Sequence, residues 1–152
     1  MKTSEGKAPK TAKAAALTLR LALAAGFLSA VADRFGLWGK PGAPGVAWGD
    51  WSHFISYTAK LNWFLPRSLI QPLGALATLL EIILAVGLLA GFWPRGFALA
   101  SSGLLLLFAL SMTFALGVKP PLDASVYSAA AGAALLGTVV CRRKTSGNAT
   151  PS

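Results

Sequence analysis

Long apolar runs separated by short polar stretches are the dominant pattern in this chain of 152 residues. A helix of about 20 apolar residues crosses the hydrocarbon core of a bilayer. Four runs approach this length and predict membrane-spanning helices at 14–32, 69–92, 96–116 and 124–141. The last run is the shortest and is rich in alanine. We therefore predict an all-α integral membrane protein, a four-helix bundle that occupies residues 14–141.

The longest connection, between the first two predicted spans, contains a further helical pattern at 51–65. Apolar and aromatic residues recur there at three- and four-residue steps, while Ser52 and Lys60 occupy another face. Asp50 is placed to cap this helix and Pro66 to end it. Tryptophan and tyrosine are enriched at membrane interfaces. The pattern predicts an amphipathic helix lying on the outer surface, and a lid over a ligand site is the alternative.

The charge pattern indicates a membrane topology. The chain has a net charge of +9 although only 12% of its residues are charged. Many of the basic residues lie in two predicted disordered tails, 1–13 and 142–152, and basic residues flank spans on the cytoplasmic side. In a soluble domain such a basic charge would suggest nucleic-acid binding. Here the membrane topology accounts for it, and we predict no nucleic-acid partner. We expect a bacterial cytoplasmic (inner) membrane protein with both termini in the cytoplasm and with Arg34 in an outer loop.

The start of the chain permits a second interpretation. Its lysines, its apolar run and the small residues at 30–32 are arranged like the three parts of a secretory signal peptide. Cleavage there would leave three spans and a mature chain beginning at Asp33. Arg20 interrupts the apolar run, so we favour a first span that is retained.

Two charged residues lie inside predicted spans. Glu81 is at the middle of 69–92, where a carboxylate costs roughly 2.5 kcal/mol or more, and Arg20 lies in the first span. Thr78, Glu81 and Ala85 share one helix face of small and polar residues, which predicts that Glu81 faces the bundle. Two roles follow for Glu81. It forms an ion pair with Arg20 that fixes the packing of two spans, or it is a protonatable site that handles a proton or a ligand.

Small residues recur at four-residue spacing in two of the predicted spans. Such stripes let neighbouring membrane helices approach closely, so we expect both to be packing surfaces, within the bundle or in a homodimer. The stripes are Ala22, Gly26 and Ala30 in the first span, and Ser125, Ala129, Ala133 and Gly137 in the fourth.

The sequence contains few residues that could carry catalysis. The single cysteine, Cys141, excludes an intramolecular disulfide, and the single histidine, His53, cannot by itself form a metal or haem site. Glycine-rich nucleotide motifs and a serine–histidine–acid set are also missing. We predict no catalytic residues and no metal. The residues that could offer an outer surface to a ligand or partner are Trp48, Trp51, His53 and Tyr57.

Across residues 17–136 the chain resembles the DoxX family of small membrane proteins. The matching motifs are Leu19-Arg20-Leu21-Ala22-Leu23, Ala77-Thr78-Leu79-Leu80-Glu81-Ile82, and Leu88-Leu89-Ala90-Gly91-Phe92 before Arg95. The arginine of the first span and the glutamate of the second are recognisable polar positions of that family.

The resemblance implies a four-helix membrane protein that acts as an accessory subunit for quinone-linked or oxidative-stress redox proteins, with a quinone as a candidate cofactor. An activity of its own is not implied. The alternatives are a small proton-coupled transporter that uses Glu81, and a structural membrane protein that assembles others.

Overall fold

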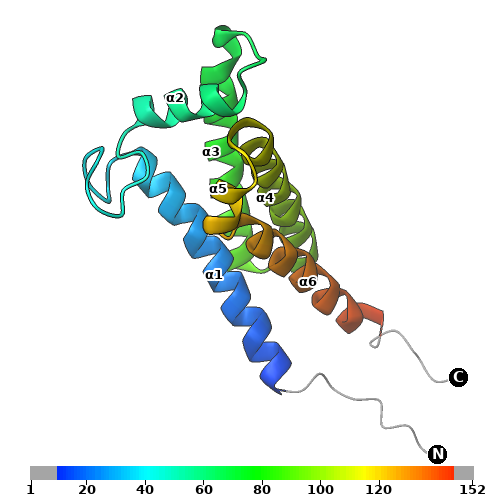
Figure 1. The fold of residues 1–152 in the computed structure, drawn as a ribbon. Coiled ribbons are helices and arrows are strands. Elements are labelled where there is room, and N and C mark those ends of the chain that lie inside the picture. The colour runs from blue at the N-terminus through cyan, green and yellow to red at the C-terminus, as the bar shows by residue number, and fades with distance from the viewer. Residues whose placement is uncertain (1–9, 146–152) are drawn as a thin grey trace, which may run out of the picture.

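The computed structural model describes residues 10–145, and the side chains of residues 10–138. This part of the chain is all-helical. The helices are α1 (Lys10–Arg34), α2 (Trp51–Leu61), α3 (Arg67–Ala90), α4 (Pro94–Leu116), the short α5 (Lys119–Asp123) and α6 (Val126–Thr145). The start of α1 and the end of α6 lie toward the same end of the molecule, and α2 lies at the opposite end (Figure 1).

Three helices, α1, α3 and α4, are long and apolar enough to cross a membrane. The apolar part of α6 is shorter, at Val126–Thr138. Leucine, isoleucine and phenylalanine side chains on the outside of α1, α3 and α4 are exposed. A soluble protein would bury such residues, so these surfaces indicate contact with a lipid bilayer.

Several helix ends differ from those predicted. The helix α1 begins within the predicted tail 1–13 and extends to Arg34, and α6 continues beyond 141 to Thr145. The remainder of both predicted tails lies outside the described residues. The helix α2 ends at Leu61, before Pro66, because the Asn62 backbone and side-chain amides both donate to the Thr58 carbonyl and close its last turn. At its start, the predicted cap is confirmed, since Asp50 accepts a hydrogen bond from the His53 backbone at 2.8 Å.

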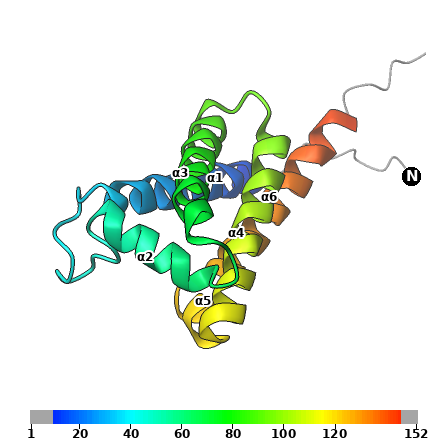
Figure 2. The ribbon, with the colours of Figure 1, turned by 90° about the horizontal axis from the view of Figure 1, so that it is seen from above.

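The core is a single cluster formed by α1, α3, α4 and α6. The side chains of α1 pack mainly against α3, and those of α4 pack against α6. The buried members are Leu23, Ala24 and Phe27 of α1, Leu84, Ala85 and Leu88 of α3, Ala98 of α4, and Ala133 and Leu136 of α6. Seen from above, α2 crosses one end of these helices, from the end of α1 toward α4 (Figure 2).

The two predicted small-residue stripes have different roles. The stripe of α6 packs as expected, since Ala133 is fully buried and Gly137 lies against Leu99 of α4. The stripe of α1 is not a packing surface within the chain, because its Gly26 has no atom within 4 Å of an added Cβ; packing in a homodimer stays a prediction. The packing face of α1 is instead the adjacent Leu23, Ala24 and Phe27 face. The small residues leave an open space beside α1.

The helix α6 begins near the middle of α4 (Figure 1). The Ser102 hydroxyl in the first half of α4 donates to the Ala130 carbonyl at 2.8 Å, and α6 begins only four residues before Ala130. The link through α5 folds back along α4 to reach this point. The second half of α4 therefore extends beyond the start of α6.

Candidate functional site

A buried ion pair joins α1 to α3. Nη2 of Arg34 donates to Oε1 of Glu81 at 2.7 Å, and the two side chains are 3% and 2% exposed. Nη1 of Arg34 donates to the Thr78 hydroxyl, also at 2.7 Å. The Thr78 hydroxyl in turn donates to the Gly74 carbonyl one turn earlier on α3. The prediction that Glu81 faces the bundle interior agrees with this position.

Aromatic rings complete the surroundings of the Arg34 guanidinium. Its Cζ lies 4.0 Å from the ring centroid of Phe54 on α2 and 5.3 Å from that of Trp48. Stacking of this kind favours arginine, whose flat guanidinium is weakly hydrated. The Arg34 charge therefore contacts a carboxylate and two aromatic rings that lie side by side, with centroids 5.4 Å apart.

Asp33, the residue before Arg34, fixes the loop that carries Trp48. Its Oδ2 accepts hydrogen bonds from the backbone amides of Ala47 at 3.1 Å and Trp48 at 2.8 Å. Asp33 is buried. Two consecutive residues at the end of α1 thus organise the site, Arg34 by binding Glu81 and Asp33 by holding the loop over it.

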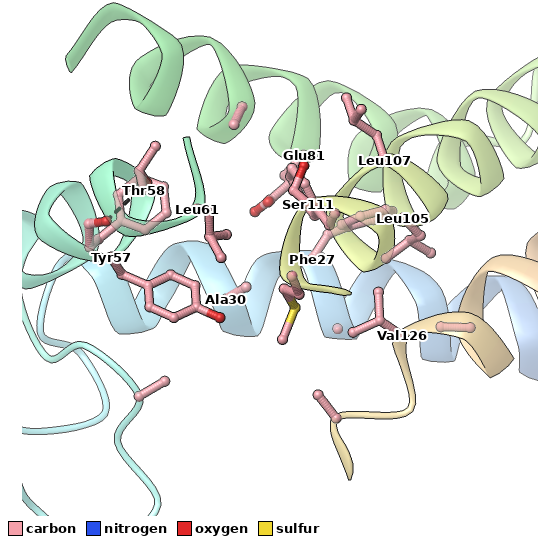
Figure 3. A pocket seen from close by; sticks show the side chains of 18 of the residues that line it. Phe27, Ala30, Tyr57, Thr58, Leu61, Glu81, Leu105, Leu107, Ser111 and Val126 are labelled. Carbon is pink, nitrogen blue, oxygen red and sulfur yellow. Dashed lines mark hydrogen bonds between the residues drawn. The ribbon is translucent and has the colours of Figure 1, made fainter. Parts of the chain in front are cut away.

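The ion pair lies beside a partly open cavity of about 810 Å³, and Figure 3 shows Glu81 among its lining residues. The cavity is bounded by α1, α2, α3, α4 and the start of α6, and its walls are mostly apolar. Its lining includes Ala22, Gly26, Phe27, Ala30 and Arg34 of α1; Trp48; Phe54, Tyr57 and Thr58 of α2; Ala77 and Glu81 of α3; Phe108, Ser111 and Met112 of α4; and Val126. The volume is in the range of small-molecule sites.

Two of the four residues predicted for an outer ligand surface line the cavity, and two do not. Trp48 and Tyr57 line the cavity. Trp51 stacks instead on Phe35, with ring centroids 6.0 Å apart, and is not part of the lining. His53 is exposed and also lies outside the lining. Burial raises the pKa of the Tyr57 phenol above its usual value of 10.0, so Tyr57 presents a neutral hydroxyl.

His53 instead belongs to the start of α2. Its backbone amide, and then its ring Nδ1 at 2.9 Å from Oδ1, lower the pKa of the Asp50 carboxyl below 3.8. Asp50 therefore remains a charged helix cap across the neutral range. This contact explains the position of the histidine without a metal or haem.

The predicted pairing of Arg20 with Glu81 is wrong. Arg20 lies in the first half of α1, whereas Arg34 ends this helix. The Nε of Arg20 donates to the Leu88 carbonyl at 2.9 Å, and its Nη2 donates to the Leu88 and Leu89 carbonyls. The last carbonyls of a helix have no partner within the helix. Arg20 supplies these partners at the end of α3, close to Gly91, which has a φ of 71°. Its role here is to join α1 to α3.

We expect Arg20→Met to destabilise the protein by about 1.5–3 kcal/mol, because hydrogen bonds from a charged donor to the Leu88 carbonyl are lost. Thermal unfolding in detergent measures the change. Lys13→Met is the matched control, since Lys13 is exposed on the same helix. Equal stability of the two variants would contradict a joining role for Arg20. Arg20 is not among the residues that line the cavity, so ligand binding by Arg20→Met is expected to persist.

Sequence reasoning missed Arg34 and Asp33 because the first span was ended at residue 32. A signal was nevertheless present. Continuing the helix by two residues places Arg34 seven positions after Phe27, on the same buried face. Among the described residues, no cluster of three or more histidine, cysteine or acidic side chains could hold a metal ion. Comparison of the chain with family models, curated proteins and solved structures finds no match.

Proposed function

We propose that this chain is a DoxX-like accessory subunit of the bacterial cytoplasmic membrane, which crosses the membrane four times and binds a quinone in the cavity. In this proposal it serves a quinone-linked or oxidative-stress redox partner and has no catalytic residues of its own. The observation that carries the proposal is a mostly apolar cavity with a buried Arg34–Glu81 pair in its wall. A quinone has the same two-part character, an apolar tail and a polar head.

The helical arrangement supports four crossings. The start of α1 and the end of α6 lie toward one end (Figure 1), which an even number of crossings requires. Lys10 and Lys13 are at the start of α1, and Arg142, Arg143 and Lys144 are near the end of α6. Basic residues at these ends favour the cytoplasmic side for both.

The test of quinone binding is the quinone content of the protein purified in mild detergent from its native membrane. We expect near-stoichiometric quinone with the wild-type chain and a loss of most of it with Gly26→Leu, which places a side chain into the cavity. Gly103→Leu is the matched control. Both glycines lie in helices with no atom within 4 Å of an added Cβ, but Gly103 is outside the cavity lining.

Equal quinone content in the two glycine variants, or none in the wild type, would contradict quinone binding in this cavity. The accessory role is tested separately, by mass spectrometry of proteins that co-purify with the tagged chain. A dehydrogenase or quinone enzyme in near-stoichiometric amount is expected. A chain that is recovered alone or only with itself would contradict the accessory role.

A small proton-coupled transporter is the second candidate. It is favoured by one observation, because Oε2 of Glu81 is buried beside the cavity and has no hydrogen-bond partner in the described part of the chain. Acidic residues in membranes often mark proton paths. In reconstituted vesicles this role predicts a folded Glu81→Gln protein whose pH-dependent flux is lost. Flux that survives the substitution would contradict it.

A further inference from the structure

Two polar atoms of the ion pair have no partner. Oε2 of Glu81 and Nε of Arg34 are buried and without hydrogen bonds in the described part of the chain. Their neighbours in the same groups are occupied, because Oε1 binds Nη2 and Nη1 binds the Thr78 hydroxyl. Buried polar atoms are rarely left in this way. Asp33 Oδ1 is also buried without a partner but lies outside the cavity lining, whereas Arg34 and Glu81 belong to the cavity wall. A ligand that meets this part of the wall would supply both of their missing partners.

Oε2 of Glu81 and Nε of Arg34 require opposite hydrogen-bonding partners. In the ion pair, Glu81 is a carboxylate whose oxygens only accept, and the Arg34 guanidinium only donates. The ligand must therefore offer a donor to Oε2 and an acceptor to Nε. A hydroxyl group supplies both, because it has one O–H and two lone pairs. A quinone carbonyl or an ether oxygen supplies only the acceptor and leaves Oε2 unsatisfied.

Charged head groups fit less well. An ammonium group would satisfy Oε2 but would bring a second positive charge beside Arg34. A carboxylate or phosphate would bring a negative charge beside Glu81. The pair is already internally neutral, and removing a further charge from water would have no opposite charge to offset it. The head group that fits is a neutral hydroxyl.

The rest of the cavity specifies the remainder of the ligand. Around the ion pair the walls are apolar, with Phe27, Phe108 and Met112 among the lining residues. Figure 3 shows Glu81, Tyr57 and Phe27 around one space. The cavity is partly open, and three of the helices that line it, α1, α3 and α4, are those long and apolar enough to cross a membrane. An alkyl or prenyl chain can leave the cavity through its opening and continue into lipid.

We infer that the cavity binds a long-chain amphiphile through a hydroxyl head group, a phenol or an alcohol, with Glu81 Oε2 accepting and Arg34 Nε donating. The inference rests on the proposed function and deepens it, since the redox form that fits is the quinol and not the quinone. The same chemistry is present in an aliphatic long-chain alcohol. The experiment therefore separates these two sources.

The test compares ligands that differ in one hydrogen-bond donor. Para-nonylphenol and its methyl ether are titrated into the wild-type protein in lipid nanodiscs, with quenching of tryptophan fluorescence as the readout, since Trp48 lines the cavity. We expect the phenol to bind about ten- to a hundred-fold more tightly, the effect of one hydrogen bond to a charged group. A short-chain quinol, its quinone and a long-chain alcohol form the second arm.

The outcomes distinguish the inference from the proposed function. Equal affinity of quinol and quinone, with equal affinity of phenol and ether, overturns the hydroxyl inference and leaves quinone binding in place. Binding of the phenol and the alcohol without the quinol supports the inference and overturns the quinone role. Tighter binding of the ether and the quinone indicates that Glu81 carries a proton and overturns the inference. If no probe binds, both fail.

Two variants assign the preference to Glu81. Glu81→Gln replaces one carboxylate oxygen by an amide donor, so the phenol preference is expected to vanish or to reverse toward the ether. Tyr57→Phe removes the hydroxyl of another residue that lines the cavity and is expected to retain the preference. Loss of the preference in Tyr57→Phe would assign it to that phenol and overturn the role of Glu81. If Glu81→Gln does not fold, the relative affinities of phenol and ether for the wild-type protein and for Tyr57→Phe still test the inference.

Discussion

Arg34→Ala is expected to lower the free energy of unfolding by about 3–5 kcal/mol, because it leaves the Glu81 carboxylate buried without a partner. The Thr78 hydroxyl loses its donor in the same substitution. Thermal or chemical unfolding in detergent measures the loss. Arg95→Ala is the matched control, since Arg95 is exposed at the start of α4.

The double variant Arg34→Met with Glu81→Leu tests whether the lost stability comes from leaving one buried charge without a partner. Two apolar side chains of similar volume leave no unpaired charge, so most of the lost stability is expected to return. Ligand binding is not expected to return, because the double variant lacks both charged groups that hold the head group. An Arg34→Ala protein as stable as the Arg95→Ala control would show that water reaches Glu81, and would contradict a buried pair.

Asp33→Ala is expected to destabilise the loop that carries Trp48. Two backbone amides, of Ala47 and Trp48, lose a charged acceptor, and each such bond contributes about 1.5–3 kcal/mol. The loop that places Trp48 against Arg34 should then open locally. Faster hydrogen exchange in the peptide containing residues 46–49 measures this opening.

Asp33→Asn is the graded control for this prediction. Its amide oxygen can still accept from both backbone amides but carries no charge, so exchange should increase less than in Asp33→Ala. Both variants keep the Arg34–Glu81 pair. Unchanged exchange in Asp33→Ala would indicate that the loop is held by its own turns, independently of Asp33.

The apolar runs were sufficient to predict the helical class and the membrane character of the chain. Periodicity placed Glu81 on an inward face of its helix, and the Asp50 cap followed from local helix chemistry. These features depend on neighbours in sequence. The partner of Glu81 does not, because Arg20 and Arg34 lie on roughly the same face of α1. Which one meets Glu81 depends on the inclination of α1 against α3.

The cavity could not have been predicted for a related reason. The spacing of Ala22, Gly26 and Ala30 favours close helix packing, but the same small side chains also leave room when no helix is beside them. The outcome is decided by where α6 begins, and that follows from the fold-back of α5 along α4. The chain positions of Trp48 and Tyr57 likewise do not reveal that they share a wall with Glu81.

The position of the cavity between helices long and apolar enough to cross a membrane changes what affinity means for this site. A ligand that enters there comes from the bilayer, so its relevant concentration is its mole fraction among lipids and not its concentration in water. Its chain leaves one apolar environment for another and gains little hydrophobic free energy, just as membrane helices gain little from apolar contact. Every lipid is then a competitor for the apolar walls. Selection among lipids falls to the few polar atoms of Arg34 and Glu81.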